Sequence, residues 1–245
     1  IALVGTVAVS VFGVSSWILF FPFVFYYFFV PFLDFLFGED ISNPPDSAIE
    51  ALEADAYYRW ITYATIPILW IAVIFNCIFL CTFSLTTLEW IATVMSTGSV
   101  LGFGLNVSHE LGHKLQTVPR KIALFNTALG AYGHFSIEHN RGHHRHVSTP
   151  EDPASSKMGE NIYQFACREM PGAALRAWRL EADRLQRQNK SVWHFENEIL
   201  QALCLTTLVY GTLIGLYGFD MVLVLIPVAI WGAFQLTSAN YVEHY

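Results

Sequence analysis

Histidines are concentrated in one part of the sequence, between "HELGHK" and "GHHRHV", and their spacing suits metal binding. Positions i and i+4 of a helix lie on the same face. His109 and His113 can therefore bind one metal ion, and His139 and His143 repeat the same spacing. On an ideal helix His144 points about 100° away from His143. That direction suits a ligand to a second metal ion.

The stretch "HELGH" also has the H-E-x-x-H pattern of zinc peptidases, in which Glu110 would act as the general base. A catalytic zinc ion needs about three protein ligands. Here at least five imidazoles are available, and His244 is a sixth if the fold brings it close. This supply favours two metal ions over one. Imidazole binds iron, copper and zinc alike, so the ligand type leaves the metal open, and metal content would separate the two hypotheses.

Carboxylates flank the histidines, and we expect them to orient the rings rather than to bind metal. Ligating histidines commonly donate their second ring N–H to a carboxylate. The alternative is solvation, or salt bridges with Arg141 or Arg145. His134 lies off the face of His139 and is a further candidate for a supporting role. The carboxylate candidates are Glu110, Glu138, Asp152 and Glu243.

The composition indicates a polytopic membrane protein. The chain has 245 residues, of which 54% are hydrophobic, and its mean hydropathy is +0.42. A spanning helix needs about 20 mainly apolar residues. We expect an all-α integral membrane bundle in a single membrane domain. Complete spans are expected near 14–33, 60–82, 85–107, 199–217 and 219–240, with an incomplete span at 1–11. Both ends lie in or beside apolar sequence, so we interpret the chain as a fragment.

The basic residues predict the orientation of the chain in the membrane. All 13 Lys and Arg residues except Arg59 lie between Lys114 and Lys190. Because positive charge accumulates on the cytoplasmic side, segment 108–198 is expected there. Alternating spans then place segment 34–58, a solvated connection, and His244 on the same side. The histidines are therefore expected at the cytoplasmic boundary of the membrane.

Four motifs, "HELGHK", "EHNRGHH", "TPEDPASS" and "NYVEHY", together resemble the membrane alkane 1-monooxygenase family. This family lies within the histidine-box superfamily of fatty acid desaturases and hydroxylases, and the likeness extends over nearly the whole chain. It implies a six-span enzyme of the bacterial inner membrane with a non-haem di-iron centre. It also implies terminal hydroxylation of n-alkanes with O₂, with electrons from rubredoxin and rubredoxin reductase. The ligands implied by the resemblance are His109, His113, His139, His143, His144 and His244.

The sequence departs from the family in one respect and leaves other functions open. The family has a further H-x-x-H-H box with three more ligands, which this sequence does not contain. Within the superfamily, a fatty-acyl desaturase or hydroxylase and a xylene-type monooxygenase remain alternatives that product analysis would separate. A metal transporter would be expected to carry ionisable residues within its spans. The spans of this sequence are almost free of charged residues, with Glu89 as the visible exception, which disfavours a transporter. Nothing indicates nucleic-acid binding.

The aromatic second span is a candidate wall of the substrate site. An alkane offers no hydrogen bonds, so its site must be shaped by apolar side chains. Tyr26 and Phe29 are our candidates for residues that limit alkane length; the alternative is that they face lipid. In the span 85–107, Gly98 and Gly102 have the spacing of small residues at close helix contacts.

A basic segment, 168–190, offers two interpretations. It can be an amphipathic helix that faces solvent or lipid headgroups. Alternatively, Arg176 and Arg179 can attract an acidic electron carrier.

Overall fold

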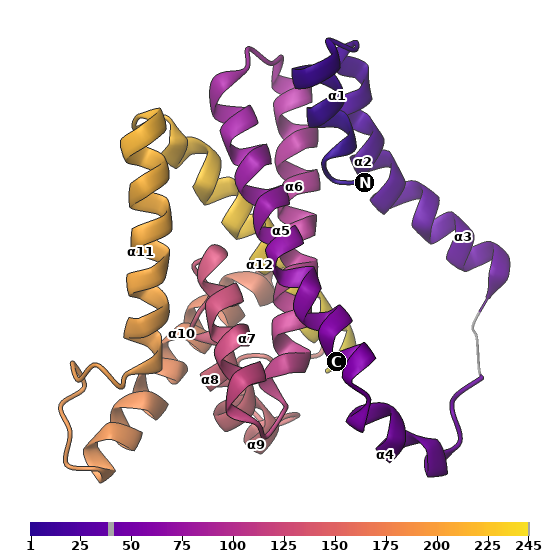
Figure 1. The fold of residues 1–245 in the computed structure, drawn as a ribbon. Helices are drawn as coiled ribbons and strands as arrows, with labels where there is room; N and C mark the ends of the chain where they lie inside the picture. Colours follow the sequence, from indigo (N-terminus) through magenta and orange to yellow (C-terminus); the bar gives the residue numbers. More distant parts are fainter. Residues whose placement is uncertain (39–41, 245) are drawn as a thin grey trace.

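A computed structural model describes residues 1–38 and 42–244, and all the regular structure in these ranges is helical. Five helices are long and apolar enough to cross a membrane, which confirms the expected all-α integral membrane fold (Figure 1). These five helical spans are Ser16–Phe37, α5 (Ala56–Thr82), α6 (Thr87–Gly112), α11 (Glu198–Tyr217) and α12 (Met221–Glu243).

The first of these spans is built from four consecutive pieces. They are η1 (Ser16–Leu19), α2 (Phe20–Val24), η2 (Phe25–Phe29) and α3 (Val30–Phe37). The η2 piece is π-helical, and Pro31 lies just after it. Proline has no N–H to bond the carbonyl four residues earlier, and such freed carbonyls are a common cause of helix irregularities.

Shorter helices connect the spans. They are α1 (Val4–Phe12), α4 (Asp46–Ala54), α7 (Thr117–Leu129), α8 (Phe135–Glu138), η3 (His139–His143), α9 (His144–His146) and α10 (Ile162–Arg187). The connection between the first two long spans therefore contains a helix, α4, that begins directly after Pro44 and Pro45. At nine residues α1 is too short to span a membrane, as is the apolar segment 1–11 with which it overlaps.

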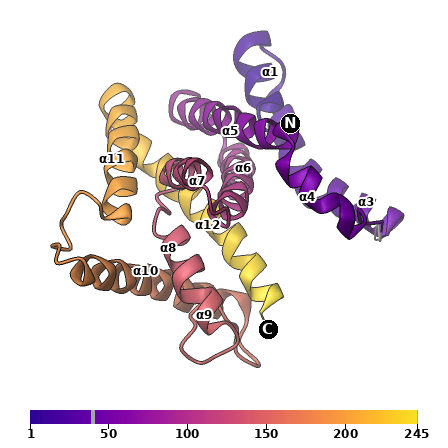
Figure 2. The same ribbon diagram turned by 60° about the horizontal axis from the view of Figure 1, so that its bottom comes forward.

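The central helix of the bundle is α6, which contacts α5, α7 and α12 (Figures 1 and 2). Glu89, the acidic residue in the first turn of α6, forms a capping box with Thr86 at the start of the helix. The Glu89 carboxylate accepts from the Thr86 N–H at 2.8 Å. The charge therefore lies at the helix end and not within the apolar core.

Glycines allow α12 to approach α6 closely, as their spacing predicts. A Cβ atom at Gly98 would lie 2.7 Å from the Trp231 side chain, and one at Gly102 would lie 2.8 Å from Gln235. Side chains larger than hydrogen at these two positions would therefore separate the helices. Both helices continue from this contact toward the histidines.

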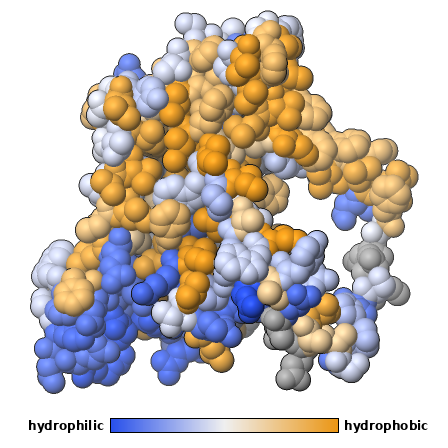
Figure 3. All heavy atoms as spheres, in the orientation of Figure 1, coloured by the Kyte–Doolittle hydropathy of each residue, from blue (hydrophilic) through white to orange (hydrophobic). Residues whose placement is uncertain are grey.

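The two ends of the bundle differ in polarity. The α5–α6 and α11–α12 turns lie at one end, whereas α4, the helices α7 to α10 and the C-terminus lie at the other (Figure 1). Hydrophobic side chains cover the upper part of the surface, and hydrophilic ones gather around the lower end (Figure 3). The exposed apolar residues include Trp17, Phe35 and Leu216, at 72–86% exposure, which is the surface expected to face lipid.

Candidate metal centre

Four histidine rings converge at the C-terminal end of α6. The Nε2 atoms of His109 and His113 are 2.8 Å apart, and that of His113 lies 3.2 Å from Nε2 of His139. The Nε2 atom of His144 lies 3.1 Å from that of His139. One nitrogen from each of His109, His113 and His139 lies within 4.8 Å of the others, close enough to bind one ion. We call His109, His113, His139 and His144 the first histidine group.

A π-helical turn explains why His144 belongs to this group. The His144 N–H donates to the carbonyl of His139, five residues earlier, so these two residues lie one above the other. The spacing rules of an ideal α-helix pair His139 with His143 and direct His144 elsewhere. In the structure the rings of His139 and His143 still stack, with centroids 5.2 Å apart, but the Nε2 atom of His139 lies beside that of His144 and the Nε2 atom of His143 lies beside that of His244.

His143 forms a second group with the other end of the chain. Its Nε2 lies 3.0 Å from Nε2 of His244, which follows α12. Its Nδ1 lies 2.8 Å from Oδ2 of Asp152. The backbone carbonyl of His244 accepts from both the N–H and the hydroxyl of Ser156, each at 3.1 Å. The motif "TPEDPASS" therefore orients both members of the second histidine group, His143 and His244.

Asp152 is fully saturated with hydrogen-bond donors. Besides His143, its carboxylate accepts from the Ser155 hydroxyl at 2.6 Å, from the Ala154 N–H at 3.2 Å and from Arg176 at 2.7 Å. Burial opposes ionisation, but the bonds from His143, Ser155 and Arg176 hold the pKa of Asp152 well below its usual range. An ionised Asp152 keeps the His143 proton on Nδ1. The lone pair of Nε2 is then free to bind a metal ion.

Arg176 joins Asp152 to Glu138 and is a structural residue. Its guanidinium also bonds Glu138 and, at 3.1 Å, the carbonyl of Glu151. Burial raises the pKa of Glu138 although Arg176 opposes this. A Cβ atom at Gly142 would lie 2.7 Å from Nε of Arg176, so only glycine fits between the histidines of "HNRGHH".

These contacts argue against Arg176 as a docking residue, because its side chain is largely buried and bound to two carboxylates. Arg168 and Arg184 of α10 also pair with acidic residues, as does Lys190, which follows the helix. Arg179 and Arg187 are exposed. The basic segment largely supports the fold around the histidines.

The remaining supporting candidates lie at different distances from the rings. An oxygen of Glu110 is 3.5 Å from Nδ1 of His109, and one of Glu243 is 3.7 Å from Nε2 of His244; both carboxylates are exposed. Glu110 lies on the far side of the His109 ring from the cluster, which is the position of an orienting carboxylate and not of a peptidase base. His134 packs on Tyr132 instead of on a ligand ring, and burial lowers its pKa to about 4.

A buried asparagine holds the histidine end of α6 in place. The Asn126 amide donates to the Gly104 carbonyl at 2.6 Å and to the Ser108 hydroxyl at 2.8 Å, and its oxygen accepts from Trp70 at 3.0 Å. Asn126 thus ties α7 and α5 to the turn of α6 that precedes His109. Its position in the sequence gave no signal of this role, because its partners are remote.

The surroundings of His139, His144 and His244 favour the neutral ring over the protonated one. Burial and the neighbouring histidines lower the pKa of His139 to about 2, and burial followed by nearby rings lowers those of His144 and His244. Neutral imidazole is the form that binds metal. Convergent neutral nitrogen donors, with carboxylates beside Nδ1 of His109 and His143, therefore fit one or two transition-metal ions.

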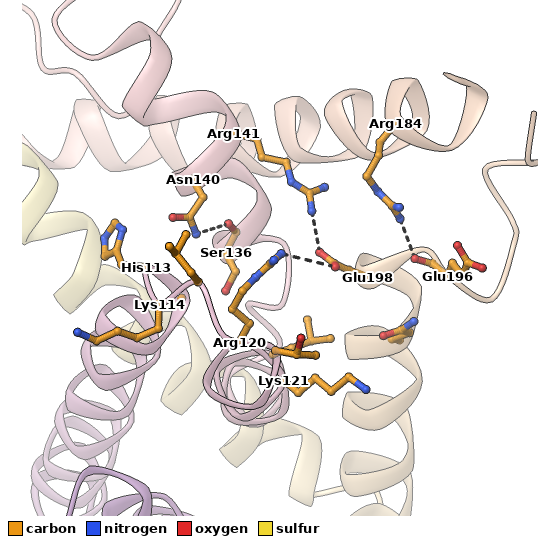
Figure 4. A pocket seen from close by; sticks show the side chains of 15 residues that line it. His113, Lys114, Arg120, Lys121, Ser136, Asn140, Arg141, Arg184, Glu196 and Glu198 are labelled. Atoms are coloured by element: carbon orange, nitrogen blue, oxygen red, sulfur yellow. Dashed lines mark hydrogen bonds and ion pairs between the residues drawn. The ribbon is translucent and has the colours of Figure 1, made fainter. Parts of the chain in front are cut away.

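A polar cavity of about 530 Å³ opens beside His113 (Figure 4). In the wall of this cavity the Glu198 carboxylate forms ion pairs with Arg141 at 3.3 Å and with Arg120 at 4.0 Å. Charged walls suit water or a polar partner, and not an alkane. The cavity brings solvent to the edge of the first histidine group.

The two candidate substrate residues lie in different settings. The Tyr26 ring packs on Phe103 of α6, with centroids 5.5 Å apart. Phe29 is 46% exposed and packs on Phe25 of its own helix. Tyr26 thus faces the bundle, whereas Phe29 lies on its outer surface.

Comparison with known proteins places this arrangement in a family. Residues 84–245 match the fatty acid desaturase family, and the chain belongs to it. It is 50% identical over 217 residues to alkane 1-monooxygenase of Pseudomonas putida, which covers 88% of this chain and 54% of that protein. It is 48% identical over 223 residues to alkane 1-monooxygenase 1 of Alcanivorax borkumensis, covering 91% and 55%.

A more distant relative matches a smaller share of the chain. The xylene/toluene monooxygenase hydroxylase component of Pseudomonas putida is 31% identical over 141 residues, which is 58% of this chain and 38% of that protein. The chain spans about half the length of the alkane monooxygenases that it matches.

Proposed function

We propose that this chain is part of a membrane monooxygenase that hydroxylates the terminal carbon of n-alkanes with O₂. The observation that carries the proposal is the convergence of six imidazoles from three regions of the sequence at the polar end of an apolar bundle. Identity of 50% to a protein named alkane 1-monooxygenase supports the choice of substrate.

The proposed metal is iron, two ions held by the two histidine groups. Bound iron would supply the O₂-derived oxidising power that breaking an unactivated C–H bond requires and that side-chain acids and bases lack. The residues of this chain have separate tasks. Asp152 keeps the proton of His143 on Nδ1, Arg176 keeps Asp152 ionised, and the apolar helices exclude water from the substrate.

Electrons are proposed to come from rubredoxin, reduced by rubredoxin reductase. The carrier must approach the polar end of the bundle, since the histidines lie there. Of the two arginines considered for docking, Arg176 is bound to carboxylates and Arg179 is exposed, so Arg179 is the docking candidate that remains. Arg179→Glu should slow the reduction step and weaken its salt dependence. An unchanged rate would remove Arg179 from the docking surface.

The proposed location is the bacterial inner membrane with the histidines on the cytoplasmic side. The support is the concentration of Lys and Arg between Lys114 and Lys190, in the segment that carries most of the ligands. Modification of Cys167, which is exposed at this end, by an impermeant thiol reagent in intact cells would test the orientation. Labelling only after the membrane is opened supports the proposed side.

Tyr26 is proposed to limit the length of the alkane, and Phe29 remains a weaker candidate because it lies on the outer surface. Tyr26→Ala should extend the accepted chain length, since the ring packs on Phe103 of α6, six residues before His109. Gas-chromatographic product profiles over a series of n-alkanes measure this. Unchanged profiles in both Tyr26→Ala and Phe29→Ala would end the hypothesis.

The decisive experiment for the function uses the whole protein in membranes with rubredoxin, its reductase and a reduced nicotinamide cofactor. We expect alkane-dependent O₂ consumption, a 1-alkanol product and two irons per protein. A double bond in a fatty-acyl substrate would indicate a desaturase, and oxidation of a xylene methyl group would indicate the xylene-type alternative. One zinc and no O₂ consumption would support a peptidase.

A further inference from the structure

A polar cluster lies inside the apolar bundle, centred on the hydroxyl of Tyr27. The hydroxyl accepts from Nε1 of Trp231 at 2.9 Å and from Nε2 of Gln235 at 3.0 Å. It lies 2.6 Å from the hydroxyl of Ser99. The cluster joins η2 to α12 and α6, three elements that are far apart in the sequence.

Counting protons shows that the Tyr27 hydroxyl is saturated. The Ser99 hydroxyl donates its one proton to the Met95 carbonyl at 2.8 Å, so Tyr27 must be the donor in the Tyr27–Ser99 bond. The Tyr27 oxygen then accepts the two remaining bonds, from Trp231 and Gln235. A hydroxyl has one donor and two acceptor sites, and all three are used. Without this oxygen, the N–H groups of Trp231 and Gln235 would lose this acceptor in an apolar environment, which is unfavourable, whereas Ser99 would keep its bond to Met95.

The two helices that meet Tyr27 are those that carry metal ligands. Trp231 and Gln235 fit against Gly98 and Gly102 of α6, where a Cβ atom would lie within 2.8 Å of them. Ten residues after Ser99, about 15 Å along α6, lies His109. His244 follows nine residues after Gln235. The cluster therefore fixes the position of α12 along α6. It does so at residues that precede the histidines of both helices in the chain.

Tyr27 is also the polar anchor of the π-helical piece Phe25–Phe29. Its neighbours Phe28 and Phe29 are exposed, so they do little to fix the rotation of this piece. Tyr26, the adjacent residue, packs on Phe103. A rotation of the π-helical piece would move Tyr26 along α6.

We propose that Tyr27 is a positioning residue for the reaction. Its hydroxyl fixes the rotation of the π-helical piece against α6 and α12, and so holds Tyr26 against Phe103, six residues before His109 on α6. The proposal deepens the proposed alkane hydroxylation and rests on it for the effect on substrate length. The structural part of the proposal does not depend on the substrate.

The test compares Tyr27→Phe with Tyr210→Phe in the whole protein. Tyr210 is a matched control, because its buried hydroxyl also makes an interhelical bond, to the Leu129 carbonyl at 3.0 Å, but it contacts neither η2 nor a ligand helix through that bond. We expect Tyr27→Phe to change the ratio of kcat/KM for long and short alkanes roughly tenfold, in favour of the longer. Tyr210→Phe should leave the ratio unchanged.

A second measurement is independent of activity. Spin labels at Phe28→Cys and Leu223→Cys, both exposed positions, report the distance from the π-helical piece to the start of α12, in a background without the exposed Cys167 and Cys204. Tyr27→Phe should broaden the distance distribution and Tyr210→Phe should not. If Tyr27→Phe does not fold, Trp231→Phe, which loses one bond of the three, is measured instead.

The outcomes separate this inference from the proposed function. An unchanged distance distribution, or an unchanged kcat/KM ratio in a variant that remains active on alkanes, overturns the role of Tyr27. A wild-type protein that oxidises no alkane overturns the proposed function, and the distance measurement still decides the positioning role.

Discussion

The backbone N–H of His144 donates to the carbonyl oxygen of His139, five residues earlier in the chain. This one bond divides the motif "HNRGHH" between the two histidine groups. His139 and His144 face the histidines of α6, whereas His143 faces His244 and Asp152. Neighbours in the sequence thus belong to different parts of the centre.

The first prediction concerns membership of the first histidine group. His144→Ala should lose bound metal to the same extent as His139→Ala, because their Nε2 atoms are 3.1 Å apart. Metal analysis of the purified protein measures the loss. His146→Ala is the control, since this exposed histidine should leave the metal content unchanged. Full metal content in His144→Ala would exclude it as a ligand.

The second prediction concerns Asp152. Asp152→Asn removes the charge that holds the Nδ1 proton of His143 and that pairs with Arg176. We expect metal affinity or activity to fall about 10- to 100-fold, the usual range for supporting residues of metal ligands. Competition with a chelator measures the affinity. The same substitution at the exposed Asp183 should change nothing, and equal affinities in both variants would contradict the role of Asp152.

The third prediction concerns the space beside Arg176. Gly142→Ala places a methyl group 2.7 Å from Nε of Arg176, which cannot move freely because two carboxylates hold it. We expect a loss of about 1–3 kcal/mol in the free energy of unfolding, as for other overpacked sites. Gly211→Ala is the matched control, with no atom near the added carbon. Equal thermal stability of the two variants would show that Arg176 yields.

The fourth prediction concerns a carboxyl group between α10 and α12. Glu169 is buried, accepts from Thr237 at 2.9 Å, and lies 3.5 Å from the amide of Asn240. Burial raises its pKa to about 7 from 4.5. Between these two values the folded protein keeps a proton that the unfolded chain has lost, so stability falls as pH rises.

Above pH 7 the buried Glu169 should therefore lower the free energy of unfolding by at most about 3 kcal/mol relative to low pH. Unfolding of the detergent-solubilised protein between pH 5 and 8 measures the slope, and Glu169→Gln should flatten it. Asp183→Asn should keep the wild-type slope. A Glu169→Gln variant with the wild-type pH dependence would show that the carboxyl is ionised in the folded state.

Features that depend on local patterns were predictable from the sequence. Long apolar segments specify membrane helices whatever their neighbours are, because the bilayer requires each span to satisfy its own backbone. The pairing of His109 with His113 follows from the helix period, and both rings take part in the first histidine group. The spacing of Gly98 and Gly102 likewise indicated a close helix contact.

Tertiary contacts decided the rest of the centre. The π-helical turn brings His144 beside His139 and contains Gly142. The side chain of Arg176, 34 residues later in the chain, occupies the space beside Gly142. Asn126 acts through partners on two other helices.

The longest of these relationships joins Tyr27 to Gln235, 208 residues apart. Helix period and hydropathy act over a few turns, so the sequence by itself determined the membrane helices and the supply of histidines. Which rings lie together, which arginine supports them and which tyrosine links the helices depend on side chains that meet only when the bundle has packed.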